Sequence, residues 1–431
     1  MEPNEERRAN GIELFFILNA EMRGMPILGV SARYSIGITK ELLYPALAEI
    51  IKSEPLLGVN IFKKRHDKNR YYRKISAVNL DTVVKFLPEQ SVESFTEEFF
   101  KIRVPYEDDT LPLWRIFVLG DREILLGYDH AAFDGNSGAM IHKSLANYLG
   151  VTTSLESPIV PTCNKPIRPG LTDMVDIKPS IVWLLKVVFK ELILSRLFSE
   201  RKGFRVGVPA VWPYSSKTVV ATLNAADTAI LLNRSKQLKI PLTSILLVCW
   251  IQTVLQELPH GKEKITIKSE CQVDLRRFLG PEDANPLGNF VGPHDFDNVS
   301  SNQMGEVFAE DIARDFNAGL RRDLRNIRGD KIFGNAALDQ FDVEGFLKQM
   351  KRRKHVGISN LGAKLIEGEK CRVENMTFFQ AAGSVSATYI MNVVSVKGGS
   401  LNMALSIACD DEEKTTGNRL KTRLLDALRN V

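Results

Sequence analysis

The chain has 431 residues, which is enough for two domains or one large one. Hydrophobic residues make up 44% and charged residues 25%, the balance of an ordinary globular protein with a sizeable core. The net charge of +5 is mild, and the basic clusters at 63–65 and 351–354 have no interleaved aromatic residues, which argues against a nucleic-acid stacking surface. We therefore expect no nucleic-acid partner.

The cysteines indicate a reducing compartment. Their number is odd, and no two have the spacing of zinc ligands or of a redox pair, so we expect neither a metal site nor a disulfide framework. They are Cys163, Cys249, Cys271, Cys371 and Cys409. The apolar run at 14–18 is too short for the core of a signal peptide. These features predict a cytoplasmic protein.

The first 150 residues alternate between strand-like and helix-like segments. Pro45 weakens one of the helices unless it lies in the first turn, and the polar tip at 66–69 predicts a hairpin. Strands are predicted at 11–18, 57–62, 71–75, 113–119 and 124–126, and helices at 38–52, 92–100 and 138–148.

A linker separates the two halves. Residues 151–180 are rich in Pro, Thr and Ser, and an apolar segment at 181–198 follows, interrupted by charges such as Lys186 and Lys190. Those charges exclude a spanning helix and predict an amphipathic one. It either packs against the protein or lies on a membrane or lipid-droplet surface. We therefore predict domains at 1–150 and 216–431, with a crossover linker at 151–215.

The second half repeats the alternation of strands and helices. Its most apolar helix, at 241–258, carries a buried face that includes Trp250. Strands are predicted at 217–223, 264–271, 355–362, 387–396 and 400–408, and helices at 225–238, 241–258, 303–325 and 417–428.

His130 is the strongest candidate for chemistry. It follows the apolar run at 124–126, so it lies where a buried strand ends and the chain turns. An imidazole with a near-neutral pKa can accept a proton and return it. Asp134 either orients His130 directly or holds the loop through a salt bridge, and Gly135 offers positive φ for a tight turn. A lone His near an Asp is more often structural, so spacing alone leaves both readings open.

The context of this pair carries a family resemblance. His130-x-x-x-Asp134-Gly135 after an apolar strand resembles the signature shared by chloramphenicol acetyltransferase, peptide-synthetase condensation domains, plant BAHD acyltransferases and fungal alcohol acetyltransferases. Four further segments resemble family motifs in the expected order: Pro112–Arg115, Val273–Arg276, Leu287–Asn289 and Ile358–Gly362. The fungal alcohol acetyltransferases match best. The BAHD D-F-G-W-G box is absent, and Asp129 stands where condensation domains carry a second His.

The resemblance implies an α/β fold of two chloramphenicol-acetyltransferase-like domains, each a mixed sheet backed by helices, with a tunnel between them. His130 would be the general base that moves an acetyl group from acetyl-CoA, a co-substrate rather than a bound cofactor, to a hydroxyl or amine of a small or lipophilic acceptor. Asp134 would pair with Arg276, or with Arg277 as the fallback. Asn289 would be a structural turn residue.

Two of the implied assignments keep an alternative. Ser359 would donate a hydrogen bond to the tetrahedral oxyanion, or would be a strand serine satisfied by backbone. Arg352 and Arg353 would bind the phosphates of CoA, or would belong to a solvated basic turn. We expect a monomer. The rival functions are an inactive relative that binds a ligand in the tunnel, a membrane-surface interaction protein and a carrier-dependent condensation-type enzyme.

Overall fold

A computed structural model describes most of the chain. The residues described are 6–23, 27–151, 154–175, 215–257, 266–280, 286–300, 305, 308–325, 344–345, 354–383, 387–409 and 414–431. The predicted amphipathic helix at 181–198 and the candidate phosphate-binding residues Arg352 and Arg353 lie outside them.

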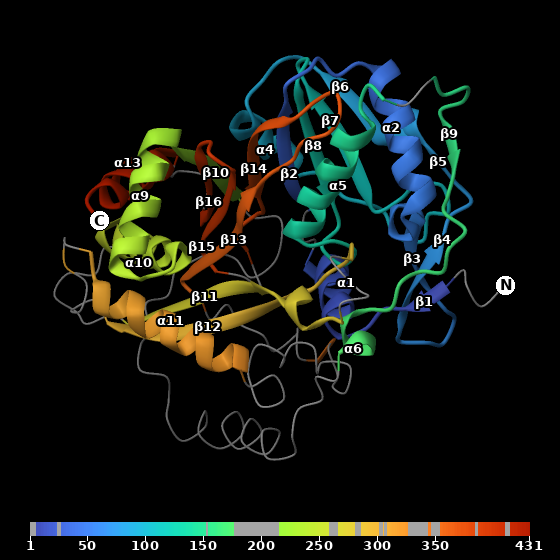
Figure 1. Ribbon diagram of the computed structural model, residues 1–431. Helices are drawn as coiled ribbons and strands as arrows, with labels where there is room; N and C mark the ends of the chain where they lie inside the picture. Colours follow the sequence, from blue (N-terminus) through green and yellow to red (C-terminus); the bar gives the residue numbers. More distant parts are fainter. Residues whose placement is uncertain are drawn as a thin grey trace.

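The N-terminal lobe is organised around a five-stranded sheet with the order β14-β2-β8-β7-β6 (Figure 1). Strands β7 and β8 form the hairpin expected from the sequence, with Gly120 at φ +66° in its turn and Trp114 opposite Tyr128 at its open end. The sheet strands are β2 (Leu28–Tyr34), β6 (Val84–Leu87), β7 (Trp114–Leu119), β8 (Glu123–Tyr128) and β14 (Val373–Phe379). The open end of the hairpin is therefore where the His130 segment begins.

Helices and two small sheets complete this lobe. Helix α5 packs on β2 and on α2, and the buried side chains between them form one continuous apolar core. The helices are α1 (Gly11–Arg23), α2 (Lys40–Ser53), α3 (Leu80–Val83), α4 (Val92–Phe99), α5 (Gly135–Tyr148) and α6 (Leu171–Met174), and η1 (Pro55–Gly58) is a 3₁₀ turn. The small sheets join β1 (Glu6–Arg8), β4 (Arg70–Lys74) and β3 (Val59–Lys63), and β5 (Ala77–Asn79) with β9 (Ile159–Pro161).

The C-terminal lobe is a six-stranded mixed sheet with the order β10-β16-β15-β13-β11-β12. Helices α9 (Ala225–Leu238), α10 (Leu242–Glu257), α11 (Glu310–Arg325) and α13 (Lys414–Arg429) cover one face and bury a second apolar core. The strands are β10 (Ser215–Leu223), β11 (Thr266–Asp274), β12 (Val291–Ser300), β13 (Val356–Lys364), β15 (Tyr389–Val396) and β16 (Leu401–Cys409), and η3 (Leu275–Phe278) is a 3₁₀ turn. Two mixed sheets backed by helices agree with the expected fold class.

The other face of this six-stranded sheet is turned toward the N-terminal lobe. Side chains alternate along a strand, and Cys271, Ile358 and Met391 belong to the second core. Val394 and Ala404, on the opposite face, belong instead to the core of the N-terminal lobe. The lobes are therefore packed together through this sheet face.

One strand crosses the expected domain boundary. The sequence placed everything after residue 216 in the second domain, but β14 pairs antiparallel with β2 and forms an edge of the N-terminal sheet. Phe379 opposite Gly29 fixes the register, and a side chain at Gly29 would collide with the Phe379 ring at 2.4 Å. The crossing strand ties the two lobes together.

The first apolar segment is a helix, so the strand predicted at 11–18 is wrong. Helix α1 is buried on nearly all sides near its start, and an apolar run without a polar face cannot be assigned from its period. A local signal was present: the Glu13 side chain accepts a hydrogen bond from the Asn10 backbone N–H at 3.0 Å, as in a capping box. The helix at 38–52 is confirmed as α2, although Pro45 lies beyond its first turn.

No helix among those described is by itself long and apolar enough to cross a membrane. The bent pair α9 and α10, with 106° between them, reaches that length and composition only when the two are combined. Most side chains of α10 are buried in the second core.

Buried His142 on α5 gives the fold a pH dependence. Tyr34 donates its hydroxyl proton to Nδ1 of His142 at 2.8 Å, and Nε2 of His142 donates to the Val30 carbonyl at 3.0 Å. This pattern corresponds to a neutral imidazole. Burial lowers the pKa of His142 to about 4. Below the unfolded-state pKa of about 6.5, the unfolded chain binds a proton that the folded chain does not, so stability falls as the pH drops.

We expect the free energy of unfolding to decrease between pH 6.5 and pH 4, by up to ~3 kcal/mol from His142. Urea unfolding at pH 7 and pH 5 measures the decrease. His142→Gln should be less stable at pH 7 but should lose less stability on going to pH 5. An unchanged pH dependence in His142→Gln would contradict this assignment.

Candidate active site

The loop that carries His130 is fixed at its start by Asp129. Its carboxylate accepts a hydrogen bond from the Tyr106 hydroxyl at 2.8 Å and another from the Ala131 backbone N–H at 2.8 Å. The Tyr72 hydroxyl donates to the Ala131 carbonyl at 2.8 Å. The residue in place of a second histidine is thus a structural anchor for the turn after β8.

The imidazole of His130 has one engaged nitrogen and one free one. Nδ1 lies 3.2 Å from the Phe133 carbonyl, which can only accept, so Nδ1 carries the proton and Nε2 carries a lone pair. Within the described part of the chain, Nε2 has no hydrogen-bond partner. Desolvation lowers the pKa of His130 to about 4, although Asp134 acts in the opposite direction. His130 is therefore neutral at physiological pH, with a free lone pair.

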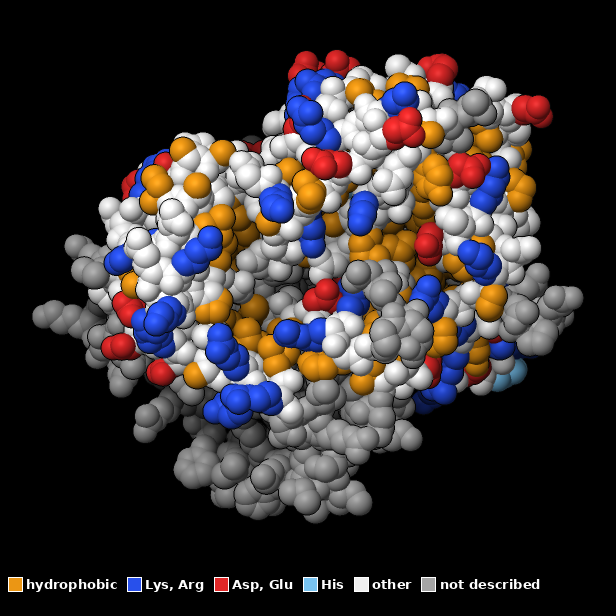
Figure 2. Space-filling model, in the orientation of Figure 1, with side chains coloured by type: hydrophobic (Ala, Val, Ile, Leu, Met, Phe, Trp, Pro, Cys, Tyr) orange, Lys and Arg blue, Asp and Glu red, His pale blue; other side chains and the backbone are white. Residues whose placement is uncertain are grey.

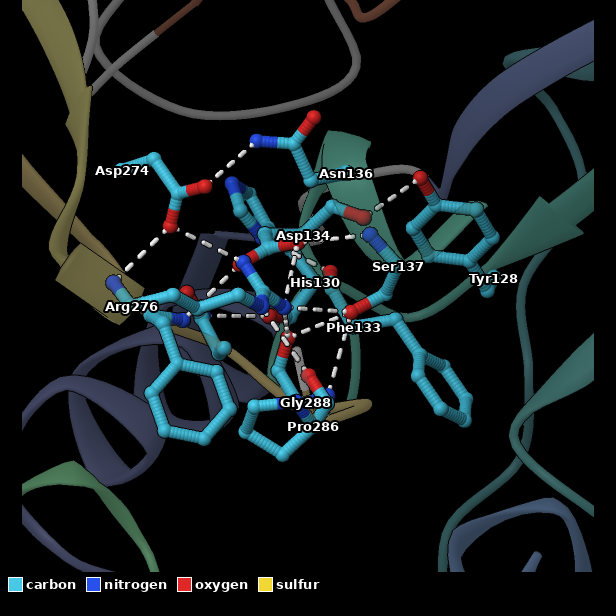
Figure 3. Close-up of polar contacts among 12 residues, drawn as sticks. Tyr128, His130, Phe133, Asp134, Asn136, Ser137, Asp274, Arg276, Pro286 and Gly288 are labelled. Carbon is cyan, nitrogen blue, oxygen red and sulfur yellow. Dashed lines mark hydrogen bonds and ion pairs between the residues drawn. The ribbon is translucent and has the colours of Figure 1, made fainter. Parts of the chain in front are cut away.

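Asp134 faces away from His130. It caps α5 by accepting the Ser137 N–H at 2.8 Å, and it forms a bidentate pair with Arg276 at 2.7 and 3.1 Å (Figure 3). The Phe290 N–H also donates to it at 2.9 Å. Burial by itself would raise the pKa of Asp134, but Arg276 and these N–H groups hold the pKa below its ordinary value. Of the two expected roles for Asp134, the salt bridge is the one observed.

Arg276 joins the two lobes at this point. It comes from η3, directly after β11 of the C-terminal lobe, and is 7% exposed. It also donates to the Pro286 carbonyl at 2.9 Å and to the Ser137 hydroxyl at 2.9 Å, and it forms a second ion pair with Asp274 at 3.2 Å. Arg277, the fallback partner, is exposed. The charge of Arg276 is thus matched by Asp134 across the lobe interface.

Asn289, Gly288 and Gly135 contribute to the backbone conformation and the close packing around the site. The Asn289 side-chain amide donates to the His130 carbonyl at 2.6 Å, so this residue holds the His130 backbone as well as forming a turn. Gly288 has φ +151°, where a side chain would be strained. Gly135 is helical, and its predicted positive φ is wrong: a Cβ there would lie 2.7 Å from Leu361 Cδ2 and 3.0 Å from Phe378 Cζ, so a side chain at this position would force its neighbours to shift.

Ser359 lies on β13, on the sheet face turned toward the N-terminal lobe. It is level with Gln272 on one side and Asn392 on the other, and it makes no hydrogen bond within the described residues. Asn392 is fully buried, and Gln380 donates to its Oδ1 at 3.0 Å, while its Nδ2 has no partner among the residues that the structure describes. Ser359 therefore lies beside a buried polar side chain on the sheet face between the lobes.

A second bridge connects the lobes next to Asp134. Asn136 donates to Asp274 at 2.9 Å and accepts from Lys364 Nζ at 2.7 Å. Figure 2 shows a hollow between the two lobes, lined largely by apolar side chains with charged ones at its rim. No group of three or more metal-ligating side chains occurs among the described residues.

The structure thus brings together five of the predicted residues: His130, Asp134, Gly135, Arg276 and Asn289. The sequence did not identify Phe16, whose ring stacks on His130 with centroids 3.9 Å apart and planes 26° apart. Phe16 could not be recognised because it is one of several apolar residues in α1, 114 positions before His130, and no local pattern connects them.

Comparison with known proteins decides the family. The family described as alcohol acetyltransferase matches residues 8–427. This chain belongs to the alcohol acetyltransferase family. Its acyltransferase membership confirms the resemblance inferred from the motifs.

Two curated relatives of this alcohol acetyltransferase family member are fungal. An uncharacterized protein of Schizosaccharomyces pombe is 30% identical over 99% of this chain and 98% of its own length. A probable alcohol acetyltransferase of Fusarium pseudograminearum, FCK4, is 22% identical over 87% of this chain and 83% of its own.

Solved structures share the fold. TRI3 trichothecene 15-O-acetyltransferase from Fusarium sporotrichioides superposes with a TM-score of 0.71 at 14% identity, covering 99% of this chain and 94% of that one. The first condensation domain of the CDA synthetase gives a TM-score of 0.65 at 12% identity, covering 99% and 97%. The fold is therefore the two-domain one of chloramphenicol acetyltransferase and condensation domains.

Proposed function

We propose that this protein transfers an acetyl group from acetyl-CoA to a hydroxyl or amine of a small or lipophilic acceptor, with His130 as general base. The observation that carries the proposal is the free lone pair on His130 Nε2 at the interface of the two lobes. Asp134 does not contact His130, so the imidazole acts without a carboxylate partner.

The reaction needs no covalent acyl-enzyme. Nε2 takes the proton of the acceptor as its oxygen or nitrogen attacks the thioester carbonyl carbon. When the tetrahedral intermediate collapses, the C–S bond breaks and the imidazolium returns the proton to the CoA sulfur. Positioned proton transfer of this kind contributes typically ~10²–10⁴-fold.

A panel of acceptors with acetyl-CoA, followed by release of free thiol, tests the proposal. Thiol release that depends on both acceptor and His130 is expected. Longer acyl-CoAs and an acyl-loaded carrier protein are included in the same panel. Turnover with the carrier only would replace this function with a condensation-type one, and binding of acetyl-CoA without turnover would indicate an inactive relative.

Ser359 is proposed as the donor to the oxyanion. Its hydroxyl lies on the inward face of β13, where it has no partner among the described residues. Ser359→Ala should reduce kcat by about 10²-fold with little change in KM, because the lost bond forms in the transition state only. Steady-state kinetics measure this split. Ser406→Ala, a buried serine bonded to Thr218 on β10, is a matched control that should keep kcat.

A further inference from the structure

The contact between Phe16 and His130 joins two distant parts of the N-terminal lobe. Phe16 comes from α1 and His130 from the turn after β8, and their rings are stacked face to face at 3.9 Å. In Figure 1, α1 lies directly below the N-terminal end of α5. One face of the imidazole is therefore covered, while Nε2, which lies in the ring plane, stays open.

Helix α1 is held firmly at both ends. Near its start, Glu13 forms a bidentate pair with Arg7 of β1, at 2.7 and 2.9 Å. Near its end, Glu21 forms a bidentate pair with Arg70 of β4, at 2.6 and 2.9 Å. Both arginines belong to the small sheet β1-β4-β3, and Tyr72 of that sheet also holds the His130 loop. One small sheet thus fixes both partners of the stack.

The charged groups around His130 are engaged elsewhere. Asp134 is the one that favours the protonated ring, and its charge is matched by Arg276. The pairs on the surrounding elements are Asp134–Arg276, Asp129–Tyr106, Glu13–Arg7 and Glu21–Arg70. When Nε2 takes a proton, the Phe16 ring face lies directly against the imidazolium, in addition to the Phe133 carbonyl at Nδ1 and the charge of Asp134.

We propose that Phe16 is a positioning residue for His130, which keeps the imidazole plane fixed and stabilises the imidazolium formed during acyl transfer. The role rests on the proposed function of His130 as general base. Aromatic faces attract a cation within about 6 Å of the centroid, and more strongly when the cation is desolvated. The stack meets that distance, and both residues are half-buried.

Two substitutions at Phe16 distinguish stabilisation of the imidazolium by the aromatic face from simple exclusion of water by an apolar side chain. Phe16→Leu keeps an apolar side chain over the ring but removes the π face, so the pKa of His130 should fall further. Phe16→Ala admits water, so the pKa of His130 should rise toward its ordinary value. Phe16→Tyr keeps the face and should behave like the unchanged protein.

Activity reports these opposite shifts at pH values where the protein is expected to stay folded. In the unchanged protein kcat/KM should be flat from pH 8 to about pH 5.5, because the pKa of His130 is about 4. Phe16→Leu should stay flat but with kcat/KM lower by about three- to tenfold. Phe16→Ala should lose activity below about pH 6.5. Phe15 lies on the same helix with its ring edge-on to Phe16, so Phe15→Leu is the matched control. It should change neither kcat/KM nor its pH dependence.

NMR titration of the His130 imidazole provides a readout that needs no substrate. A lower pKa in Phe16→Leu supports the proposal even if no acceptor is ever acetylated, so failure of the proposed function is distinguishable. An unchanged pKa and unchanged kcat/KM in folded Phe16→Leu would overturn it. Equal effects of Phe15→Leu and Phe16→Leu would overturn it too, because they would indicate packing alone.

Discussion

His130→Ala is expected to reduce acyl transfer by at least ~10²-fold while the protein stays folded. Nε2 makes no hydrogen bond to another described residue, and the half-buried ring is stacked on Phe16 on one face. The substitution therefore removes the proposed general base without breaking a buried ion pair. Thiol release from acetyl-CoA measures the rate, and calorimetric titration with CoA measures binding, which should be unchanged.

The control for this experiment is His66→Asn. His66 lies exposed at the tip of the β3–β4 hairpin with φ +65°, a conformation that asparagine tolerates. Its substitution should leave the rate unchanged. A folded His130→Ala protein with a rate close to that of His66→Asn would show that another group is the base.

Asp134→Asn should lower stability as well as rate. The substitution leaves Arg276 charged and buried, with the partly exposed Asp274 carboxylate at 3.2 Å as its remaining ion-pair partner. Removing one partner of a comparable buried pair costs ~3–5 kcal/mol. Both side chains of the pair are less than 5% exposed. Asparagine still accepts the Ser137 N–H as a helix cap, so the loss is that of the charge pair. A lower midpoint of urea unfolding is the expected result.

A double-mutant cycle tests whether the pair is the cause. Replacing Arg276 with methionine in the Asp134→Asn protein removes the buried charge that has lost its main partner, so the double variant should be less destabilised than the sum of the single ones. Glu49→Gln, which breaks an exposed pair with Lys52, should change stability by at most ~1 kcal/mol. If Asp134→Asn removed all activity at full stability, Asp134 would act in proton transfer instead.

The stability contributed by Asp134 should also vanish in acid. Its folded-state pKa is lowered, so the contribution is fully present above the unfolded-state pKa, which is about 4, and is lost as the pH falls through the lower folded-state pKa. The His142 effect operates at higher pH, between about 6.5 and 4. Unfolding curves at pH 7, 5 and 3.5 separate the two ranges.

The sequence by itself determined the local frame of the site. An apolar strand, a turn and a capped helix follow one another within residues 123–148, and such short-range patterns are set by side-chain alternation, turn chemistry and capping. Motif resemblance added Arg276 and Asn289, which the structure places on Asp134 and on the His130 backbone. The strand and helix positions follow from residue types at fixed spacing, whereas Arg276 and Asn289 came from the family resemblance alone.

Only the tertiary structure decided the long-range relations. Arg276 pairs with Asp134, which lies 142 positions earlier in the chain. Strand β14 pairs with β2 of the N-terminal lobe, and α1 is a helix that places Phe16 on His130. The strand predicted for α1 failed because a short run that is apolar on all sides has no period that distinguishes helix from strand. Contacts between distant segments depend on how whole lobes pack, and no local pattern in one segment records its partner in another.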